Sequence, residues 1–256
     1  MNRLPPEVLT SCITFVFDTD PRPILPLTHV CRYWRRSITS NPGSWASIAT
    51  GWKRLAPLCL ERAGVVPLAI DIMVSDIKSG EDFLGSLLSQ TSRIGRLRLT
   101  KYSSVEAVAG DLPGFFDSLI PNLISLELQQ TTEPAELFPS SEATVPPVFQ
   151  NFSKLESLGL VRTPLYPTLL NITSLKELKY LGYATPLPFG TLLGLLESNP
   201  GLELVVLDIR FVVDSVETAP ARMTPLARLR HLSITCSEAI DAKGLLHAYP
   251  FPVALV

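Results

Sequence analysis

The hexapeptide Leu123-Ile124-Ser125-Leu126-Glu127-Leu128 and its near copy Leu155-Glu156-Ser157-Leu158-Gly159-Leu160 decide how most of this chain folds. Leucine occupies the first, fourth and sixth positions of both segments, and other residue types lie between. Because side chains alternate between the two faces of a β-strand, the fourth and sixth leucines point the same way. Each segment is therefore expected to be a short strand with one buried leucine face and one open face.

The same pattern of aliphatic positions recurs along the chain at intervals of 20 to 32 residues. The further copies are Val65/Leu68/Ile70, Ile94/Leu97/Leu99, Leu175/Leu178/Tyr180, Leu202/Val205/Leu207 and Leu229/Leu232/Ile234. These intervals lie in or near the range of leucine-rich repeats, in which each repeat adds one strand to a shared core. We expect an α/β leucine-rich-repeat-like solenoid with short parallel strands, and Phe189 to Glu197 as a helix between two of them. The alternative is an ordinary α/β domain with parallel strands.

The residues between the inward leucines are expected to form a binding surface, because the open sheet face of such repeats usually holds a partner. Leu204 and Val206 carry most weight, since two adjacent outward aliphatic side chains are unusual on a surface that binds nothing. The candidate target-binding residues are Arg96, Arg98, Glu127, Gln129, Glu177, Lys179, Leu204, Val206, Asp208 and His231.

The first fifty residues carry a different, helical pattern. Pro5-Pro6 followed by Glu7 is typical of a helix start, because proline fits the first turn and negative charge suits the helix dipole there. Apolar residues then recur at helical spacing as far as a loop predicted at 18–23, and two more helical patterns follow before Asn41-Pro42-Gly43. The apolar residues of the first pattern are Val8, Leu9, Cys12, Ile13, Val16 and Phe17. The sequence predicts three short helices with more apolar side chains than so small a bundle can bury.

The order of three short motifs in this segment resembles an F-box. Leu4-Pro5-Pro6-Glu7-Val8-Leu9 opens it, Val30-Cys31-Arg32-Tyr33-Trp34 lies at its centre, and Pro42-Gly43-Ser44-Trp45 closes it. The likeness is strongest to divergent F-boxes of mushroom-type fungi, in which a Ser-x-Ile follows, here Ser47 and Ile48. The resemblance implies that this module binds a Skp-type adaptor and, through it, a cullin. The residues carried over as contributing to that adaptor interface, or supporting it, are Leu4, Pro5, Leu9, Ile13, Val30 and Trp34.

Composition excludes several classes of partner. The formal net charge of −2 and the pI of about 6.0 argue against nucleic acid, which usually needs a concentrated basic face. No run approaches the roughly 20 apolar residues of a membrane-spanning helix. The four cysteines, of which Cys12 and Cys31 are expected to be buried free thiols, form no Cys-x-x-Cys motif. With no signal peptide visible, a cytoplasmic or nuclear location is expected.

The sequence also lacks the common motifs of catalysis. No phosphate-binding, zinc-protease or serine-hydrolase motif occurs. The histidines His29, His231 and His247 are scattered, and none has a cysteine or second histidine at metal-binding spacing. We therefore expect no enzyme, no cofactor and no metal.

Together these patterns predict an α+β chain of three parts. Residues 1–50 are expected to be the F-box, 51–64 a linking helix, and 65–256 a leucine-rich-repeat-like domain that is incomplete at its C-terminus. The expected function is that of a substrate-receptor subunit of a Skp–cullin–F-box ubiquitin ligase, with an unknown target protein on the repeats. The alternative is an interaction scaffold that is not coupled to ubiquitin transfer.

Overall fold

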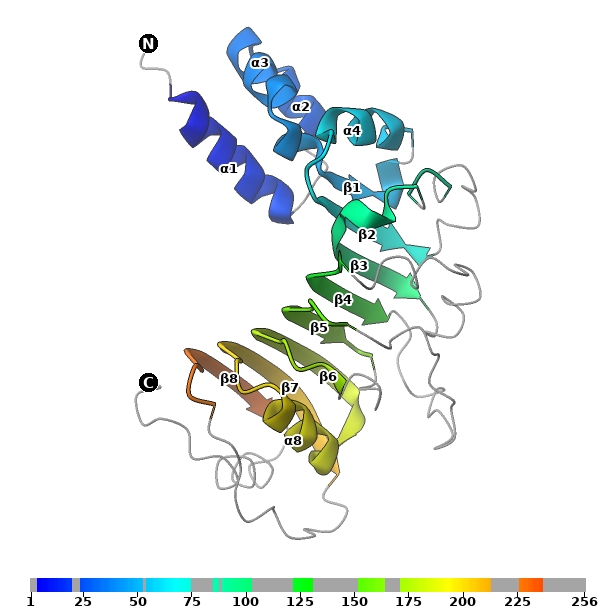
Figure 1. Cartoon of the computed structure of the whole chain (residues 1–256), viewed down its shortest axis with the longest axis vertical. Helices are drawn as coiled ribbons and strands as arrows, with labels where there is room; N and C mark the ends of the chain where they lie inside the picture. Colours follow the sequence, from blue (N-terminus) through cyan, green and yellow to red (C-terminus); the bar gives the residue numbers. More distant parts are fainter. Residues whose placement is uncertain are drawn as a thin grey trace. The chain divides into compact units, whose positions relative to one another are not determined.

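The chain combines helices with a parallel β-sheet, as the sequence predicted (Figure 1). Eight strands form the sheet, and neighbouring strands follow one another in sequence order. The chain divides into two compact units, unit 1 with residues 1–98 and unit 2 with residues 99–256, so that the boundary falls within β3 (Ile94–Tyr102). The computed structural model describes residues 4–19, 24–52, 54–74, 85–87, 89–102, 122–130, 152–163, 171–212 and 226–236.

Unit 1 begins with three α-helices, which are α1 (Pro6–Thr19), α2 (Ile24–Thr28) and α3 (Arg32–Ser40). Pro6 opens α1 and Glu7 lies in its first turn, as expected for a helix start. The helices share a small core to which Leu9 and Ile13 contribute from α1, Ile24 from α2 and Ile38 from α3. These aliphatic side chains are the buried part of a helical pattern that exposes other apolar residues.

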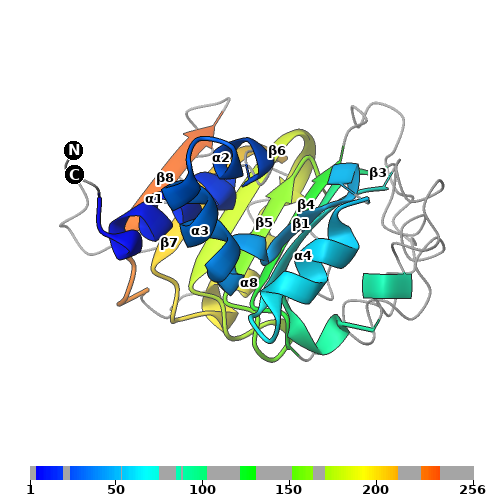
Figure 2. The same ribbon diagram turned by 90° about the horizontal axis from the view of Figure 1, so that it is seen from above.

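A short turn leads from α3 to the first strands. The side chain of Asn41 accepts a hydrogen bond from the Gly43 N–H (3.1 Å) at the start of the 3-10 helix η1 (Pro42–Trp45). The strand β1 (Ser47–Ala49) follows, and η2 (Thr50–Trp52) and α4 (Ala56–Ala63) connect it to β2 (Leu68–Met73). The two strands are parallel, with Ile48 opposite Ile70, and α4 packs against β1 (Figure 2). Unit 1 therefore continues from helices into sheet without a break.

Two details of unit 1 differ from the sequence prediction. The repeat pattern begins one strand earlier than expected, because Ser47 to Ala49 already forms the parallel strand β1. Val65 was predicted to be an inward residue, and this is wrong, since its side chain is 91% exposed. The reason is local: Gly64, with φ of +55°, ends α4, and Val65 lies in the turn beyond it.

A 3-10 helix comes immediately before the third strand. The 3-10 helix η4 (Thr91–Arg93) leads directly into β3. Arg93 donates to the backbone carbonyl of Val66 (3.1 Å) and to the side chain of Gln90 (2.6 Å), which ties the start of β3 to the start of β2. On β3 the predicted inward residues Ile94 and Leu97 are buried.

In its described residues, unit 2 beyond β3 contains five parallel strands and the helix α8 (Phe189–Ser198). The strands are β4 (Ser125–Gln130), β5 (Ser157–Val161), β6 (Glu177–Pro188), β7 (Leu204–Val212) and β8 (His231–Cys236). Their registers keep equivalent leucine positions side by side, so that Leu126 lies opposite Leu158 and Leu158 opposite Leu178. The register shifts only between Gly182 and Leu187, where β6 and β7 continue past the repeat.

The inward residues of these strands form continuous buried rows as far as β7, whereas Leu232 and Ile234 on β8, also predicted to point inward, are half-buried. The row before the strands holds Leu123, Leu155, Leu175, Leu202 and Leu229, and the next holds Leu126, Leu158, Leu178 and Val205. The helix α8 (Phe189–Ser198), predicted at Phe189 to Glu197, packs against β6 with Leu192, Leu195 and Leu196 buried. Each Å² of apolar surface that is buried stabilises the fold by about 25 cal/mol, so these rows make the main stabilising contribution to this unit.

The turn that enters each strand is also repeated. One backbone carbonyl of each turn accepts two N–H groups from the next turn, at 2.7 to 3.1 Å. The accepting carbonyls are those of Ile124, Glu156, Lys176 and Glu203. The last three residues also each donate their own N–H to the accepting carbonyl of the previous turn. This pattern keeps the strands in one register, because a slip would break both bonds at every turn.

Candidate functional site

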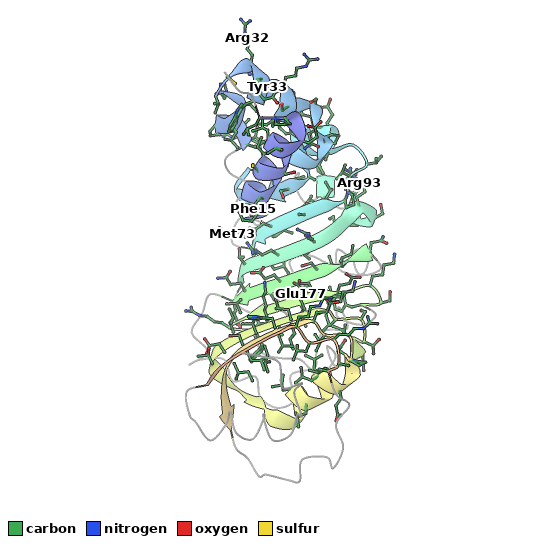
Figure 3. The ribbon with its side chains drawn as sticks, turned by 90° about the vertical axis from the view of Figure 1, so that its left-hand side faces the viewer. Phe15, Arg32, Tyr33, Met73, Arg93 and Glu177 are labelled. Atoms are coloured by element: carbon green, nitrogen blue, oxygen red, sulfur yellow. The ribbon has the colours of Figure 1, made fainter. Side chains whose placement is uncertain are left out.

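The outer face of α1 is an apolar surface on unit 1. We define it by Val8, Cys12 and Phe15, which are spaced four and three residues apart and so share one side of the helix, together with Leu4, which lies just before the helix begins. All four are exposed, Leu4 by 53% and Phe15 by 72%. Phe15 is labelled in Figure 3. Leu9 and Ile13 lie on the opposite, buried side. The small core of unit 1 covers only one apolar side of this helix, so the other apolar side is left for a partner.

The predicted adaptor-binding residues divide into three groups by burial. Leu4, Pro5 and Val30 are exposed, and Val30 retains 58% of its surface in solvent. Leu9 and Ile13 are core residues, which can support a docking surface but cannot touch a partner in this arrangement. Trp34 is half-buried.

The sequence pattern placed Val8 and Cys12 with Leu9 and Ile13 in one apolar stripe, and the structure separates them. A stripe that wraps this far around a helix cannot be buried by one neighbour, so Val8 and Cys12 face outward. The prediction of buried thiols is wrong for both Cys12 and Cys31. Phe15, the most exposed of the outer-face residues, was missed, although its spacing from Leu4 and Val8 was a readable signal.

Basic side chains are exposed on α3, the helix that packs against α1. Arg32, Arg35 and Arg36 are exposed, and Arg32 points away from the ribbon in Figure 3. Arg35 also donates through Nε to the Thr28 carbonyl (3.0 Å), which fixes α3 against the end of α2. A partner that contacts α3 would meet this positive charge, and acidic groups on that partner would suit it.

Beneath the helices, Trp45 joins unlike elements of unit 1. The indole is buried, donates from Nε1 to the Ile38 carbonyl (3.0 Å), and lies 4.5 Å below the guanidinium of Arg62 on α4. Burial raises the pKa of the neighbouring Cys59 thiol, and the positive charge of Arg62 only partly opposes this. Cys59 therefore stays a neutral core side chain at physiological pH.

The outward sheet face of unit 2 is the second candidate surface. We define it by three rows of residues that the strand registers place side by side across β4 to β8. The first row is Ser125, Ser157, Glu177, Leu204 and His231; the second is Glu127, Gly159, Lys179, Val206 and Ser233; the third is Gln129, Val161, Leu181, Asp208 and Thr235. The predicted target-binding residues of unit 2 all lie in these rows. The other two, Arg96 and Arg98, lie on β3, where Arg96 is exposed and Arg98 half-buried.

Polar groups on this face and along its edge interact with one another. Ser157 donates to a Glu177 carboxylate oxygen (3.2 Å) across two strands. In the turns just before the strands, Lys176 pairs with Glu156 (2.8 Å) and Arg230 lies 3.8 Å from Glu203. These ion pairs are exposed, so each contributes at most about 1 kcal/mol, but they neutralise charge along the edge.

The aliphatic residues of the face form one connected group. Leu204 and Val206 are neighbours on β7, Leu181 lies on the adjacent β6, and Val161 lies opposite Leu181 on β5. All four are half-buried. The sequence pattern predicted Leu204 and Val206 as outward residues. It did not include Val161 and Leu181, because each comes one residue after the last position of its repeat. Gly159 leaves room beside them for Glu127, whose Cγ would be 3.1 Å from an added Cβ.

The described residues show no site for metal chemistry or membrane crossing. In the part of the chain that the structure describes, no group of three or more His, Cys, Asp or Glu side chains could hold a metal ion. Across the same residues, no helix has both the length and the apolar character needed to span a bilayer. What the described structure offers is two surfaces.

Comparison with known proteins adds no relative. No protein-family model matches the chain, and neither a curated protein nor a solved structure matches it.

Proposed function

We propose that the chain is a substrate-receptor subunit of a Skp–cullin–F-box ubiquitin ligase. In this proposal residues 1–50 are an F-box that docks to a Skp-type adaptor, and the parallel strands are a leucine-rich-repeat-like solenoid that holds a target protein. The chain performs no chemistry itself. It raises the effective concentration of the target near the charged ubiquitin carrier, which can reach the millimolar range for linked partners.

The observation that carries the proposal is the exposure of the motif's own apolar residues. Leu4 and Pro5 open the F-box-like motif, Val30 opens its central part, and all three are exposed on unit 1. Val8 and Phe15 extend the apolar surface along α1. Exposed aliphatic and aromatic side chains on one helix face are typical of a partner-binding surface.

The repeat half of the proposal rests on the in-register strands. The solenoid reading is supported by equivalent leucines at equivalent positions and by entry turns with the same pair of hydrogen bonds. The outward sheet face supplies the target-binding surface, with Leu204 and Val206 as its apolar centre. The identity of the target is not part of the proposal.

Binding of the full chain to a purified Skp-type adaptor tests the docking half. Wild type should bind. The double substitution Leu4→Ala/Pro5→Ala should raise the dissociation constant at least about tenfold, because exposed anchor residues often contribute more than 1 kcal/mol each. Titration calorimetry measures the affinity, and circular dichroism checks that the variant stays folded.

Val65→Ala is the matched control, since Val65 is an exposed aliphatic residue of the same unit outside the motif. Its affinity should equal that of wild type. Failure of wild type to bind an adaptor that does bind an authentic F-box protein would refute the docking claim. Recovery of a cullin with the complex then separates a ligase subunit from an uncoupled scaffold.

A further inference from the structure

The N-terminal segment of unit 1 is attached to α3 by one long-range hydrogen bond. The Tyr33 hydroxyl donates to the backbone carbonyl of Leu4 at 2.5 Å, across 29 residues of sequence. Tyr33 is labelled on α3 in Figure 3, beside Arg32. The bond therefore joins the central part of the F-box-like motif to its first residue.

Leu4 needs such a contact because it lies just outside the helix. The hydrogen bonding of α1 begins at the Pro5 carbonyl, which accepts from the Leu9 N–H (3.0 Å). The carbonyl of Leu4, one residue earlier, receives the Tyr33 hydroxyl instead. Helix ends fray unless side chains satisfy such groups, so Tyr33 fixes a residue that would otherwise be free to move.

The helix that carries Tyr33 is itself held firmly. Ile38, five residues further along α3, is fully buried, and its carbonyl accepts from the Trp45 indole. Arg35 bonds the Thr28 carbonyl, which attaches the other side of α3 to α2. Tyr33 therefore projects from a supported element rather than from a loose one.

The backbone of Leu4 is fixed while its side chain stays available. Its side chain is 53% exposed, although its carbonyl is bonded. A docking residue held in this way loses less conformational freedom when a partner binds, and pre-organisation of this kind increases affinity without a new contact.

We propose that Tyr33 is a positioning residue that holds Leu4 and Pro5 in the arrangement the adaptor binds. This inference rests on the proposed function, and it deepens it by naming a residue that acts on affinity through Leu4. The phenol itself need not touch the adaptor.

The substitution Tyr33→Phe tests the role, because it removes only the hydroxyl. Affinity for the purified adaptor should fall about fivefold, equivalent to about 1 kcal/mol and the usual net value of one hydrogen bond. The midpoint of thermal unfolding should not change measurably. Backbone amide relaxation by NMR should show a lower order parameter for Leu4 in the free chain.

Two further variants separate positioning from a general loss of structure. Thr39→Val removes an exposed hydroxyl that bonds only within α3, to the Arg35 and Arg36 carbonyls, and should bind as wild type does. Adding Tyr33→Phe to Leu4→Ala should cause little additional loss, because the hydroxyl acts through Leu4. Full additivity of the two losses would overturn the positioning role.

The outcomes distinguish the inference from the function beneath it. Equal binding by wild type and Tyr33→Phe, or an unchanged Leu4 order parameter, overturns the role of Tyr33 and leaves the docking proposal intact. Failure of wild type itself to bind the adaptor overturns the proposed function and, with it, this inference.

Discussion

Units 1 and 2 are stabilised in opposite ways. Unit 1 joins unlike elements through single contacts, and the clearest case is Trp45, which meets α3 through the Ile38 carbonyl and α4 through Arg62. Unit 2 repeats one arrangement, in which equivalent leucines and equivalent turn hydrogen bonds recur from β4 to β8. The stability of unit 1 should therefore be concentrated in few residues, and that of unit 2 distributed over many.

The two surfaces differ in the same sense. On unit 1 the exposed residues are large apolar side chains on one helix face, with no described polar network among them. On unit 2 the outward face alternates charged, small and aliphatic residues, with a hydrogen bond between polar groups on the face and ion pairs along its edge. A few large apolar side chains, as on unit 1, suit a partner that is always the same. A face whose residue types vary from row to row, as on unit 2, suits recognition of one specific target.

The largest effect should come from Trp45→Ala. Removing this buried indole leaves a cavity and deletes its hydrogen bond to the Ile38 carbonyl, so the free energy of unfolding should fall by about 3–5 kcal/mol. Denaturant titration followed by circular dichroism measures the loss. Trp34→Ala is the matched control, because Trp34 is only half-buried and should cost clearly less. Equal losses for the two tryptophans would mean that the stability of unit 1 is not concentrated at Trp45.

The next largest effect should come from Asn199→Ala, where unit 2 depends on a buried polar side chain rather than on its rows of leucines. Asn199 is fully buried, donates to the Ile172 carbonyl (2.7 Å) and the Leu195 carbonyl (2.8 Å), and accepts from the Leu175 N–H (3.0 Å). Its side chain thus links the end of α8 to the turn before β6, and its removal leaves buried groups without partners. Unfolding free energy should fall by about 3 kcal/mol.

Asn122→Ala provides the comparison for Asn199. Asn122 also precedes a strand, but its side chain accepts from Lys154 (3.1 Å) in an exposed position. Its replacement should change stability by less than about 0.5 kcal/mol. A loss of similar size at both positions would mean that burial does not explain the role of Asn199.

Sequence analysis could predict the periodic parts of the fold and not the parts that depend on context. The leucine spacing gave the strands of unit 2, and the proline and acidic residue at the helix start gave α1, because both signals are local. Strand β1 was missed, since Ser47 to Ala49 is too short to show alternation and forms only by pairing with β2. Val65 was misplaced because aliphatic spacing cannot reveal that Gly64 ends the helix and turns the chain.

The candidate surfaces follow the same rule. The alternation of the strands predicted the outward position of Glu127, Lys179 and Val206, since that position is a property of the strand itself. Burial on α1 could not be predicted, because Val8 and Leu9 both fit an apolar stripe and only the packing of α3 and η1 against α1 decides which is covered. The contact from Tyr33 to Leu4 joins residues too far apart in sequence for any local pattern to indicate it.

An effect smaller than that at Asn199 is expected at a glycine, at the place where the register between β6 and β7 shifts. An added Cβ at Gly182 would lie 2.5 Å from the ring of Tyr180, which is buried and cannot move aside, so Gly182→Ala should cost about 1–3 kcal/mol. At Gly159 the nearest atom is the Cγ of Glu127, at 3.1 Å, and this half-exposed side chain can rotate away, so Gly159→Ala should be nearly neutral. Thermal unfolding of the two variants measures the difference. If Gly182→Ala is as well tolerated as Gly159→Ala, then β6 adapts around Tyr180 and the strands of unit 2 are less rigidly packed than their registers indicate.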